Sequence, residues 1–530
     1  MKIALAQFNN SVGDVFGNER KAIEYIERAR EAGARLVVMH ETLVPGYPSK
    51  DQQFTPEFVQ DCEVAQRRIG EASVGIAVIF GGIESVDGKL FNCAFAYENG
   101  KLVHTYHKHH LPNYDVFDEK RYYASGNGNG VFRIAGLKIG LNVCEDIWID
   151  PGPAEAQAKE GAELIVNISA SPYYIGKGVV RQNLLKSHIE KIGLPIIYVN
   201  QVGGQDEIVF DGESYAFNGK GEMLAQARQF EEDLCVFSLE GKGIAVKAHE
   251  RLAEVYSALK LGLRDYVRKN GFSRAILGLS GGADSALVAA IAADAIGPEN
   301  VYSVYMPSKF NVSESQIYAQ RLANNLGIKF SISPITEIYE AALSHPDCRD
   351  VEFGVHHENL QARLRMSILY FFSGINNAMV LNTSNKSESA IGYGTVYGDM
   401  AGGFAVISDV PKTLAFELLR YVNDNAGYER IPEFIIKRPP SAELAPNQKD
   451  SDALPPYHIL DAIVHAHVEE IKGPVQIAKE TGIDLAMVRD VVRRIQAAEH
   501  KRGVFPRGTK ITPRAFGTGR RMPIANGYKI

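Results

Sequence analysis

The chain has 530 residues, more than one hydrophobic core normally serves, so two or three domains are expected. Hydrophobic residues make up 45% and charged residues 23% of the sequence, and the net charge of −6 gives no overall positive field that would attract nucleic acid. Five scattered cysteines are too few for a disulfide framework and favour a reducing, cytoplasmic setting. No window is apolar for long enough to predict a membrane span, and the first residues, MKIALAQFNNSVGD, turn polar too early for a signal peptide.

Short β runs with interspersed helices occupy the first half, up to about Lys247. Strands are predicted at residues 2–8, 35–40, 75–82, 90–97, 138–144, 163–169 and 195–200, and helices at 18–32, 153–159 and 178–192. The turn Glu98-Asn99-Gly100 indicates a hairpin. This half is therefore expected to be an α+β layered domain with a mixed sheet, covering residues 1–247.

The pattern changes after Lys247 to alternating helices and strands, which is typical of a doubly wound parallel sheet. Helices are predicted at 251–270, 313–325 and 356–377, with a further apolar helix ending at Gly297; strands are predicted at 275–279, 301–307, 328–334 and 378–383. A proline- and charge-rich stretch, 431–457, precedes a final helical segment. The second domain is expected to cover 248–530.

A glycine-rich loop, LGLSGGADSA, joins the strand at 275–279 to the apolar helix. Such a loop presents backbone N–H groups and a helix N-terminus to a phosphate, but the lysine of a Walker A loop is missing. Asp284 would repel phosphate unless Mg²⁺ lay between them, so the loop predicts a metal-bound triphosphate. The alternative is a closely packed turn without a ligand. The candidate ATP-binding residues of the loop are Gly278, Leu279, Ser280, Gly281, Gly282, Ala283, Asp284 and Ser285.

This loop resembles that of the N-type ATP pyrophosphatases, which adenylylate an oxygen of their substrate. Two further segments, HENLQARLRM from His357 and LNTSNKSESAIGYGTVYGDMAGGFAVISDVPKT from Leu381, resemble the NAD synthetase family within that group. The resemblance implies that Thr383 and Lys412 also contact ATP and that Asp284 and Glu388 hold Mg²⁺. It implies deamido-NAD binding by Asn359, Arg363, Glu388, Asp399 and a late lysine, Lys510. A solvated loop is the alternative for Lys386 and Glu388.

Three residues of the first half lie at strand ends: Glu41 in VVMHETLVPGYP, Lys108 in YHKHHLPNYDVFDEKRYY and Cys144 in GLNVCEDIW. A lone cysteine is usually a small buried hydrophobe, and the other four keep that interpretation. Together, these motifs resemble the nitrilase/amidase (carbon–nitrogen hydrolase) superfamily, which implies an α-β-β-α sandwich. The resemblance makes Glu41 the base, Cys144 the nucleophile and Lys108 the group that stabilises the oxyanion.

Supporting roles follow from the same resemblance. It implies that Glu119 supports the triad and that Tyr114, Ser171 and Lys177 bind glutamine.

Four histidines, at positions 104, 107, 109 and 110, have a spacing compatible with a metal site. No cysteine or carboxylate near them in the sequence completes a ligand set. The sequence therefore favours a strand and loop whose histidines are partly exposed or support Lys108. Trp148, the only tryptophan, is predicted to lie in the core.

The order of the two halves resembles that of the glutamine-dependent NAD synthetases over nearly the whole chain. The resemblance implies that ammonia from glutamine amidates adenylylated deamido-NAD, and that the chain forms at least a homodimer through its synthetase domains. One alternative is a ligase of the same mechanism that acts on another carboxylate. A second is a nucleotide sensor without catalysis, which would predict loss of at least one of the candidate catalytic or metal-binding residues; all are present.

Overall fold

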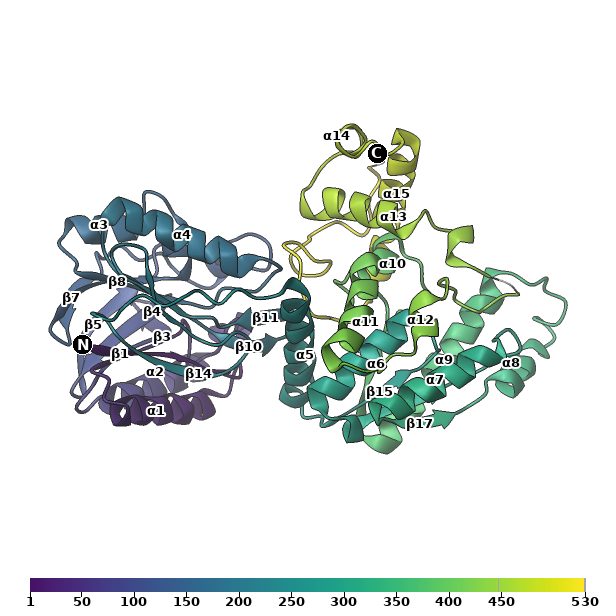
Figure 1. Cartoon of the computed structure of the whole chain (residues 1–530), viewed down its shortest axis with the longest axis horizontal. Helices are drawn as coiled ribbons and strands as arrows, with labels where there is room; N and C mark the ends of the chain where they lie inside the picture. Colours follow the sequence, from purple (N-terminus) through teal and green to yellow (C-terminus); the bar gives the residue numbers. More distant parts are fainter. Residues whose placement is uncertain (447, 529–530) are drawn as a thin grey trace. The chain divides into compact units, whose positions relative to one another are not determined.

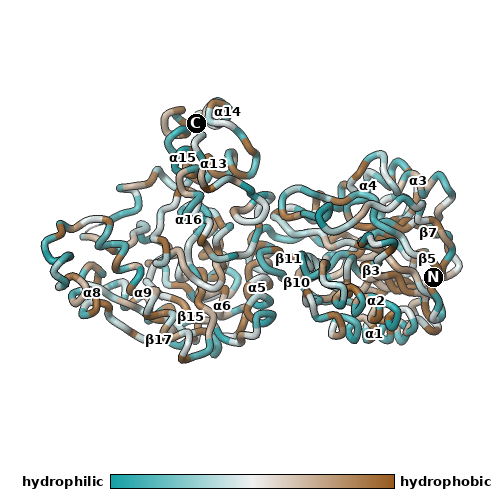
Figure 2. Tube along the Cα trace, turned by 180° about the vertical axis from the view of Figure 1, so that it is seen from behind, coloured by the Kyte–Doolittle hydropathy of each residue, from teal (hydrophilic) through white to brown (hydrophobic). Residues whose placement is uncertain are grey.

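The computed structural model describes residues 1–446 and 448–528 and divides the chain into two compact units (Figure 1). The first unit covers Met1–His249, and the second begins at Glu250. Figure 2 shows that apolar residues gather along the strands inside each unit, as expected for two separate cores. In the described part of the chain, no helix combines the length and apolar character that crossing a bilayer requires.

Two six-stranded sheets form the centre of the first unit. The first contains, in spatial order, β14 (Asp233–Ser238), β1 (Lys2–Gln7), β2 (Leu36–Met39), β3 (Ala77–Val86), β4 (Lys89–Glu98) and β5 (Lys101–His107). The second contains β13 (Met223–Gln226), β12 (Tyr215–Phe217), β9 (Ile196–Asn200), β8 (Leu164–Ser169), β7 (Leu137–Val143) and β6 (Val131–Ile134). A separate hairpin consists of β10 (Val202–Gln205) and β11 (Ile208–Asp211).

Each sheet of this unit is buried on both faces, because side chains alternate along a strand. In β1, Ile3 and Leu5 enter the core between the sheets, whereas Ala4 and Ala6 face helices α1 (Val15–Glu31) and α2 (Pro56–Glu71). Helices α3 (Pro153–Lys159) and α4 (Lys177–Ile192) pack on the outer face of the second sheet. The predicted α-β-β-α sandwich is thereby confirmed.

Two helices of this unit differ from the sequence expectation. Helix α1 begins at Val15 rather than residue 18, because the Asp14 carboxylate caps it by accepting a hydrogen bond from the Gly17 N–H at 3.1 Å. Helix α2 was not predicted; it begins at Pro56, a residue well suited to the first turn.

The second unit contains a five-stranded sheet in which every pairing is parallel. Its order is β17 (Lys329–Ile332), β16 (Val301–Tyr305), β15 (Arg274–Gly278), β18 (Ala378–Asn382) and β19 (Phe404–Ala405). Helix α9 (Val355–Asn376) packs on one face, against Ile276 and Val380, while α6 (Ala283–Ile296) contacts β15 and β16 and lies beside α5 (Arg251–Lys269) and α11 (Lys412–Ala426). Helices α7 (Ser313–Leu326) and α8 (Thr336–Leu343) belong to the other crossovers.

From β15 the chain adds β16 and β17 on one side and then β18 and β19 on the other, so the strand order reverses between β15 and β18. Ligands of open parallel sheets bind beyond the carboxyl ends of the strands at such a point. Beyond the sheet, α10 (Lys386–Ile391) shares a small core with α13 (Tyr457–Val464), α14 (Pro474–Thr481) and α15 (Leu485–Ala497). Short helices α12 (Glu433–Lys437) and α16 (Glu499–Arg502) complete the described helices of this unit. The predicted doubly wound sheet and final helical segment are both found.

Candidate functional site

The carboxyl ends of three strands of the first unit bring the predicted triad together. Glu41 follows β2, Lys108 follows β5 and Cys144 follows β7. The Lys108 ammonium donates hydrogen bonds to Glu41 Oε1 and to Glu119 Oε1, each at 2.8 Å. All four side chains are buried, Lys108 completely. Two carboxylates therefore share one buried ammonium group beside a buried thiol.

Both oxygens of the Glu41 carboxylate have fixed partners. Besides Lys108, Oε1 accepts a hydrogen bond from Asn92 Nδ2 at 2.7 Å, and Oε2 accepts one from the Ala170 N–H at 2.8 Å. Strand β3 approaches this turn so closely that a Cβ on Gly81 would lie 2.5 Å from the Glu41 Cα. Asn92 and Ala170 were not among the predicted site residues, although they hold Glu41 in place.

Cys144 begins a 3-10 turn with a φ of 45°, a left-handed conformation that non-glycine residues rarely adopt. Asp146 stabilises this turn because its carboxylate accepts a hydrogen bond from the Val143 N–H at 3.1 Å. The same carboxylate accepts hydrogen bonds from the N–H groups of His109 and His110. Asp146 thus joins the Cys144 turn to the loop that carries Lys108.

Burial and charge set the protonation of this cluster. Burial, reinforced by the Glu41 carboxylate and opposed by Lys108, raises the pKa of the Cys144 thiol well above its usual value. Burial and the neighbouring Glu41 also raise the pKa of Glu119 to about 7. Although burial opposes it, the two carboxylates hold the pKa of Lys108 above its ordinary value. The resting thiol is therefore protonated and needs a base in contact with it.

The three predicted glutamine-binding residues belong to the same unit. The Tyr114 hydroxyl donates to the Glu145 carboxylate at 3.0 Å, and Ser171 is buried, its N–H donating to Asn200 Oδ1 at 2.8 Å. Lys177 begins α4, and its ammonium lies 3.7 Å from the centre of the Trp148 ring.

The surroundings of Lys177 contain charges of both signs. Burial and the neighbouring Arg181 lower the pKa of Lys177 to about 8, while its interactions with Cys144 and Glu145 raise it. Trp148 is only partly buried, so the prediction that it lies in the core was wrong in this respect: it borders the core and supports Lys177.

The glycine-rich loop of the second unit connects β15 to α6, at the point where the strand order of the sheet reverses. Gly281 has a φ of 79°, and a Cβ there would lie 2.5 Å from the Ser315 carbonyl oxygen, so only glycine fits. The Ser280 hydroxyl accepts a hydrogen bond from the Gly282 N–H at 3.2 Å and lies 3.1 Å from the Ser285 hydroxyl. The loop leads directly into the N-terminus of α6, which begins at Ala283.

Two carboxylates and one ammonium group meet beside this loop. Lys412 Nζ donates to Asp284 Oδ2 at 2.5 Å and to Glu388 Oε1 at 3.1 Å. Burial, together with the carboxylates of Asp284 and Asp450, raises the pKa of Glu388 to about 7, although Lys412 opposes this. The structure thus brings both predicted metal ligands to one ammonium group.

Other predicted residues lie on the neighbouring strand-end loops. Thr383 directly follows β18 and is partly buried. Asn359 Oδ1 accepts a hydrogen bond from the Thr395 hydroxyl at 2.7 Å, and Arg363 Nε donates to the Val396 carbonyl at 3.2 Å, so both α9 residues face one loop, as their spacing predicts. That loop also contains Asp399, which is exposed and accepts a hydrogen bond from the Thr395 N–H at 2.8 Å.

The C-terminal segment is anchored to α10 through Lys386. Lys386 is completely buried and pairs with Asp409 at 2.9 Å and Glu469 at 2.7 Å, so the solvated-loop alternative is wrong for it. Its ammonium also donates to the Thr512 hydroxyl at 2.7 Å. Lys510 is buried in this segment, and its Nζ donates to the Thr512 carbonyl at 2.9 Å.

Comparisons with known proteins cover both units. Residues 2–246 match the carbon-nitrogen hydrolase family, and residues 255–504 match the NAD synthase family. The glutamine-dependent NAD(+) synthetase of Aquifex aeolicus is 42% identical over all of both chains, and that of Thermotoga maritima is 40% identical over 100% of this chain and 99% of that one. The solved glutamine-dependent NAD+ synthetase of Acinetobacter baumannii, in complex with ADP, is 38% identical, with a TM-score of 0.80 over 99% of this chain and 98% of that one.

Proposed function

Since the chain belongs to the glutamine-dependent NAD(+) synthetases, we propose that it forms NAD from deamido-NAD and ATP with ammonia that it releases from glutamine. We assign the glutaminase to residues 1–247 and the synthetase to 248–530. The observation that carries the proposal is the presence, in one chain, of a buried Glu41–Lys108–Cys144 cluster and of a glycine loop beside two carboxylates.

In the first unit, Glu41 takes the Cys144 thiol proton as the thiolate attacks the amide carbon of glutamine. Lys108 stabilises the oxyanion, and the C–N bond breaks when the proton passes from Glu41 to the leaving ammonia. Water, activated by the same carboxylate, then hydrolyses the thioester to glutamate. The hydrogen bonds from Asn92 and Ala170 support this role, because they orient the Glu41 carboxylate.

The glutamine backbone carries an ammonium and a carboxylate, and the first unit offers a complementary charge for each. Lys177 provides a cation and interacts electrostatically with Cys144. Glu145, which accepts a hydrogen bond from Tyr114, provides an anion and interacts electrostatically with Lys108. Ser171 provides a polar group nearby on the strand-end loop after β8. We assign glutamine binding to Tyr114, Ser171 and Lys177 on this basis.

In the second unit, the carboxylate of deamido-NAD attacks the α-phosphorus of ATP, and pyrophosphate leaves. Ammonia then attacks the acyl adenylate, giving NAD and AMP. The loop 278–285, Thr383 and Lys412 bind the phosphates, and Asn359, Arg363, Glu388, Asp399 and Lys510 bind deamido-NAD. Asp284 and Glu388 would hold Mg²⁺, which when bound neutralises charge on the pyrophosphate.

We further propose a cytoplasmic homo-oligomer assembled through the second unit. Helix α9 presents three large apolar side chains that are 47–68% exposed, Tyr370, Phe371 and Ile375, and such a patch is typical of a protein interface. The free cysteines fit a reducing compartment. Sedimentation of the full chain tests the assembly; a monomer at micromolar concentration would contradict it.

Two substitutions test the division of labour between the units. Cys144→Ala should abolish NAD formation from glutamine but leave NAD formation from added ammonium chloride within about twofold of the native rate. Asp284→Asn should abolish NAD formation from either nitrogen source, because it removes a carboxylate that we assign to Mg²⁺ binding in the second unit and leaves the residues of the first unit unchanged. Loss of ammonia-dependent synthesis in folded Cys144→Ala protein, or its retention in Asp284→Asn, would contradict the assignments.

A further inference from the structure

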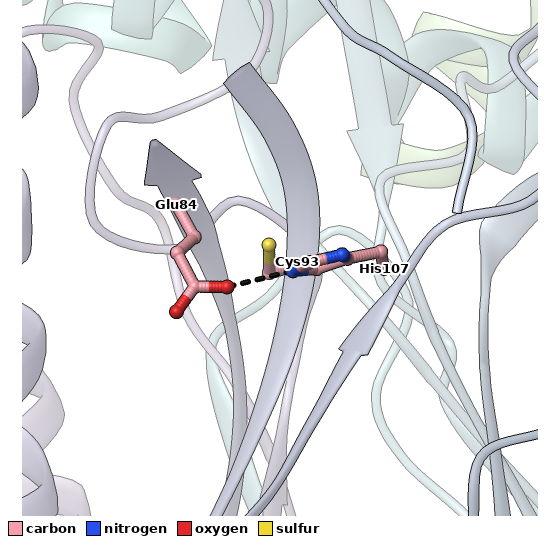
Figure 3. Close-up of side chains that lie close together, drawn as sticks. All are labelled: Glu84, Cys93 and His107. Carbon is pink, nitrogen blue, oxygen red and sulfur yellow. Dashed lines mark hydrogen bonds and ion pairs between the residues drawn. The ribbon is translucent and has the colours of Figure 1, made fainter. Parts of the chain in front are cut away.

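Three neighbouring strands of the first sheet bring together side chains that the proposed reaction does not use. Glu84 on β3, Cys93 on β4 and His107 on β5 have their ligand atoms within 4.8 Å of one another (Figure 3). The strand register explains this, because Cys93 pairs directly with His107 across β4 and β5. The histidine run has no cysteine or carboxylate nearby in the sequence, but the sheet supplies one of each.

Two of the three side chains are already in contact, and the Cys93 thiol donates a hydrogen bond to the Phe91 carbonyl at 3.4 Å. His107 Nε2 and Glu84 Oε2 are 2.6 Å apart, and the imidazole stacks on the Phe91 ring with centres separated by 4.2 Å. Cys93 is fully buried beside them. The Glu84 and His107 side chains are 32% and 26% exposed, so an ion can reach the cluster from solvent.

We propose that Glu84, Cys93 and His107 bind a divalent transition-metal ion of the zinc class, with water as a further ligand. A thiolate, an imidazole and a carboxylate together suit Zn²⁺, whereas Mg²⁺ prefers oxygen ligands only. On binding, the thiol of Cys93 releases its proton to solvent, and the metal–sulfur bond replaces the S–H bond.

The geometry needs adjustment in both directions, because the three ligand atoms spread over up to 4.8 Å while Glu84 and His107 are in contact. Zinc ligands lie about 2.0–2.3 Å from the metal, so two tetrahedral ligand atoms are roughly 3.3 Å apart. The ion pair between Glu84 and His107, now at 2.6 Å, must open by about 0.7 Å, a movement available to two partly exposed side chains.

This site is separate from the catalytic cluster but joined to it through the same strands. Asn92, the neighbour of Cys93, points to the opposite face of β4 and donates to Glu41. Lys108 follows His107 directly, and its N–H donates to the Asn92 carbonyl at 2.9 Å. An ion bound by the three strands would therefore stabilise the sheet at the point where it holds Lys108 and Glu41.

Titration of the full chain with Co²⁺ tests the proposal, because a Co²⁺–thiolate bond gives an absorption band in the near ultraviolet. The titration is carried out in the Cys144→Ala variant, so that the proposed nucleophile cannot contribute. We expect the band to saturate at one equivalent of Co²⁺, to disappear in Cys93→Ser, and to be bleached by Zn²⁺. Cys62→Ser, which changes a buried thiol on α2, is the matched control and should keep the band.

Two variants at the exposed side of the cluster keep the test valid if Cys93→Ser fails to fold. His107→Gln and Glu84→Gln should each weaken Co²⁺ binding by at least about tenfold, since loss even of outer-shell partners costs that much. Zn²⁺ should raise the unfolding midpoint of the Cys144→Ala chain, and should raise that of these variants, made in the same background, by less. Absence of the band, or a band and midpoint shift unchanged in His107→Gln and Glu84→Gln, would overturn the proposal.

Discussion

Replacement of Lys108 by methionine tests the electrostatic account of the first unit. Methionine keeps most of the apolar stem but removes the ammonium group that Glu41 and Glu119 share. The cluster then changes from two carboxylates with one ammonium group to two carboxylates with none, in a fully buried position. We expect loss of glutamine hydrolysis and a pH-dependent loss of stability.

Removing one partner of a buried ion pair costs about 3–5 kcal/mol of unfolding free energy. For a unit of this size, that corresponds to a fall in unfolding midpoint of roughly 6–20 °C. The fall should depend on pH, because Glu119 already has a pKa of about 7 in the folded protein against an ordinary value of 4.5. Without Lys108 this folded pKa rises further, so the extra penalty relative to the native chain grows once the pH exceeds about 7, the folded pKa of Glu119 in the native chain, by about 1.4 kcal/mol per pH unit.

Trp148 fluorescence is a suitable assay, because the only tryptophan of the chain lies in the first unit. Thermal unfolding of Lys108→Met should show a defect at pH 8 that exceeds the defect at pH 5.5 by about 1.4 kcal/mol. The double variant Lys108→Met/Glu119→Gln removes one of the two carboxylates left without an ammonium group and should recover part of the lost stability at pH 8. An equal defect at both pH values, or no recovery in the double variant, would refute the reasoning.

Three further predictions concern the second unit. Gly281→Ala should abolish ATP-dependent synthesis with ammonia, measured as AMP release, because its Cβ would lie 2.5 Å from the Ser315 carbonyl; normal AMP release would contradict the loop assignment. Lys386→Met leaves Asp409 and Glu469 without their shared ammonium group and should lower the unfolding free energy by about 3–5 kcal/mol in a calorimetric scan; an unchanged scan would contradict this. Chelation of divalent ions should stop AMP formation, and added Mg²⁺ should restore it; chelator-resistant activity would exclude the proposed metal.

Much of the architecture could be predicted because the hydrophobic pattern determines it locally. Strand β1 alternates between two cores, and the loop after β15 has the glycines that a strand-to-helix phosphate turn requires. Glu41, Lys108 and Cys144 were found from motifs at strand ends that resemble the nitrilase/amidase superfamily. Their common location follows from the sandwich, since β2 and β5 belong to one sheet and β7 belongs to the sheet packed against it.

The partners of these residues depend on strand register and long-range packing, which a single sequence does not reveal. Asn92 lies in the middle of an apolar strand, and only the pairing of β4 with its neighbours places its amide on Glu41. In the sequence, Lys386 lies in a polar run that is typical of a surface loop. In the structure it is buried and pairs with Asp409 and Glu469, which come from distant segments. In the same way, Glu84 and Cys93 reach His107 only across three strands.

The most direct test of the central claim is NAD formation from deamido-NAD and Mg-ATP, with glutamine as the only nitrogen source and the nucleotide product identified as AMP or ADP. The account predicts NAD, glutamate and AMP in equal amounts. ADP in place of AMP would contradict the role of the glycine loop. NAD with ammonia but none with glutamine would contradict the role of the Glu41–Lys108–Cys144 cluster.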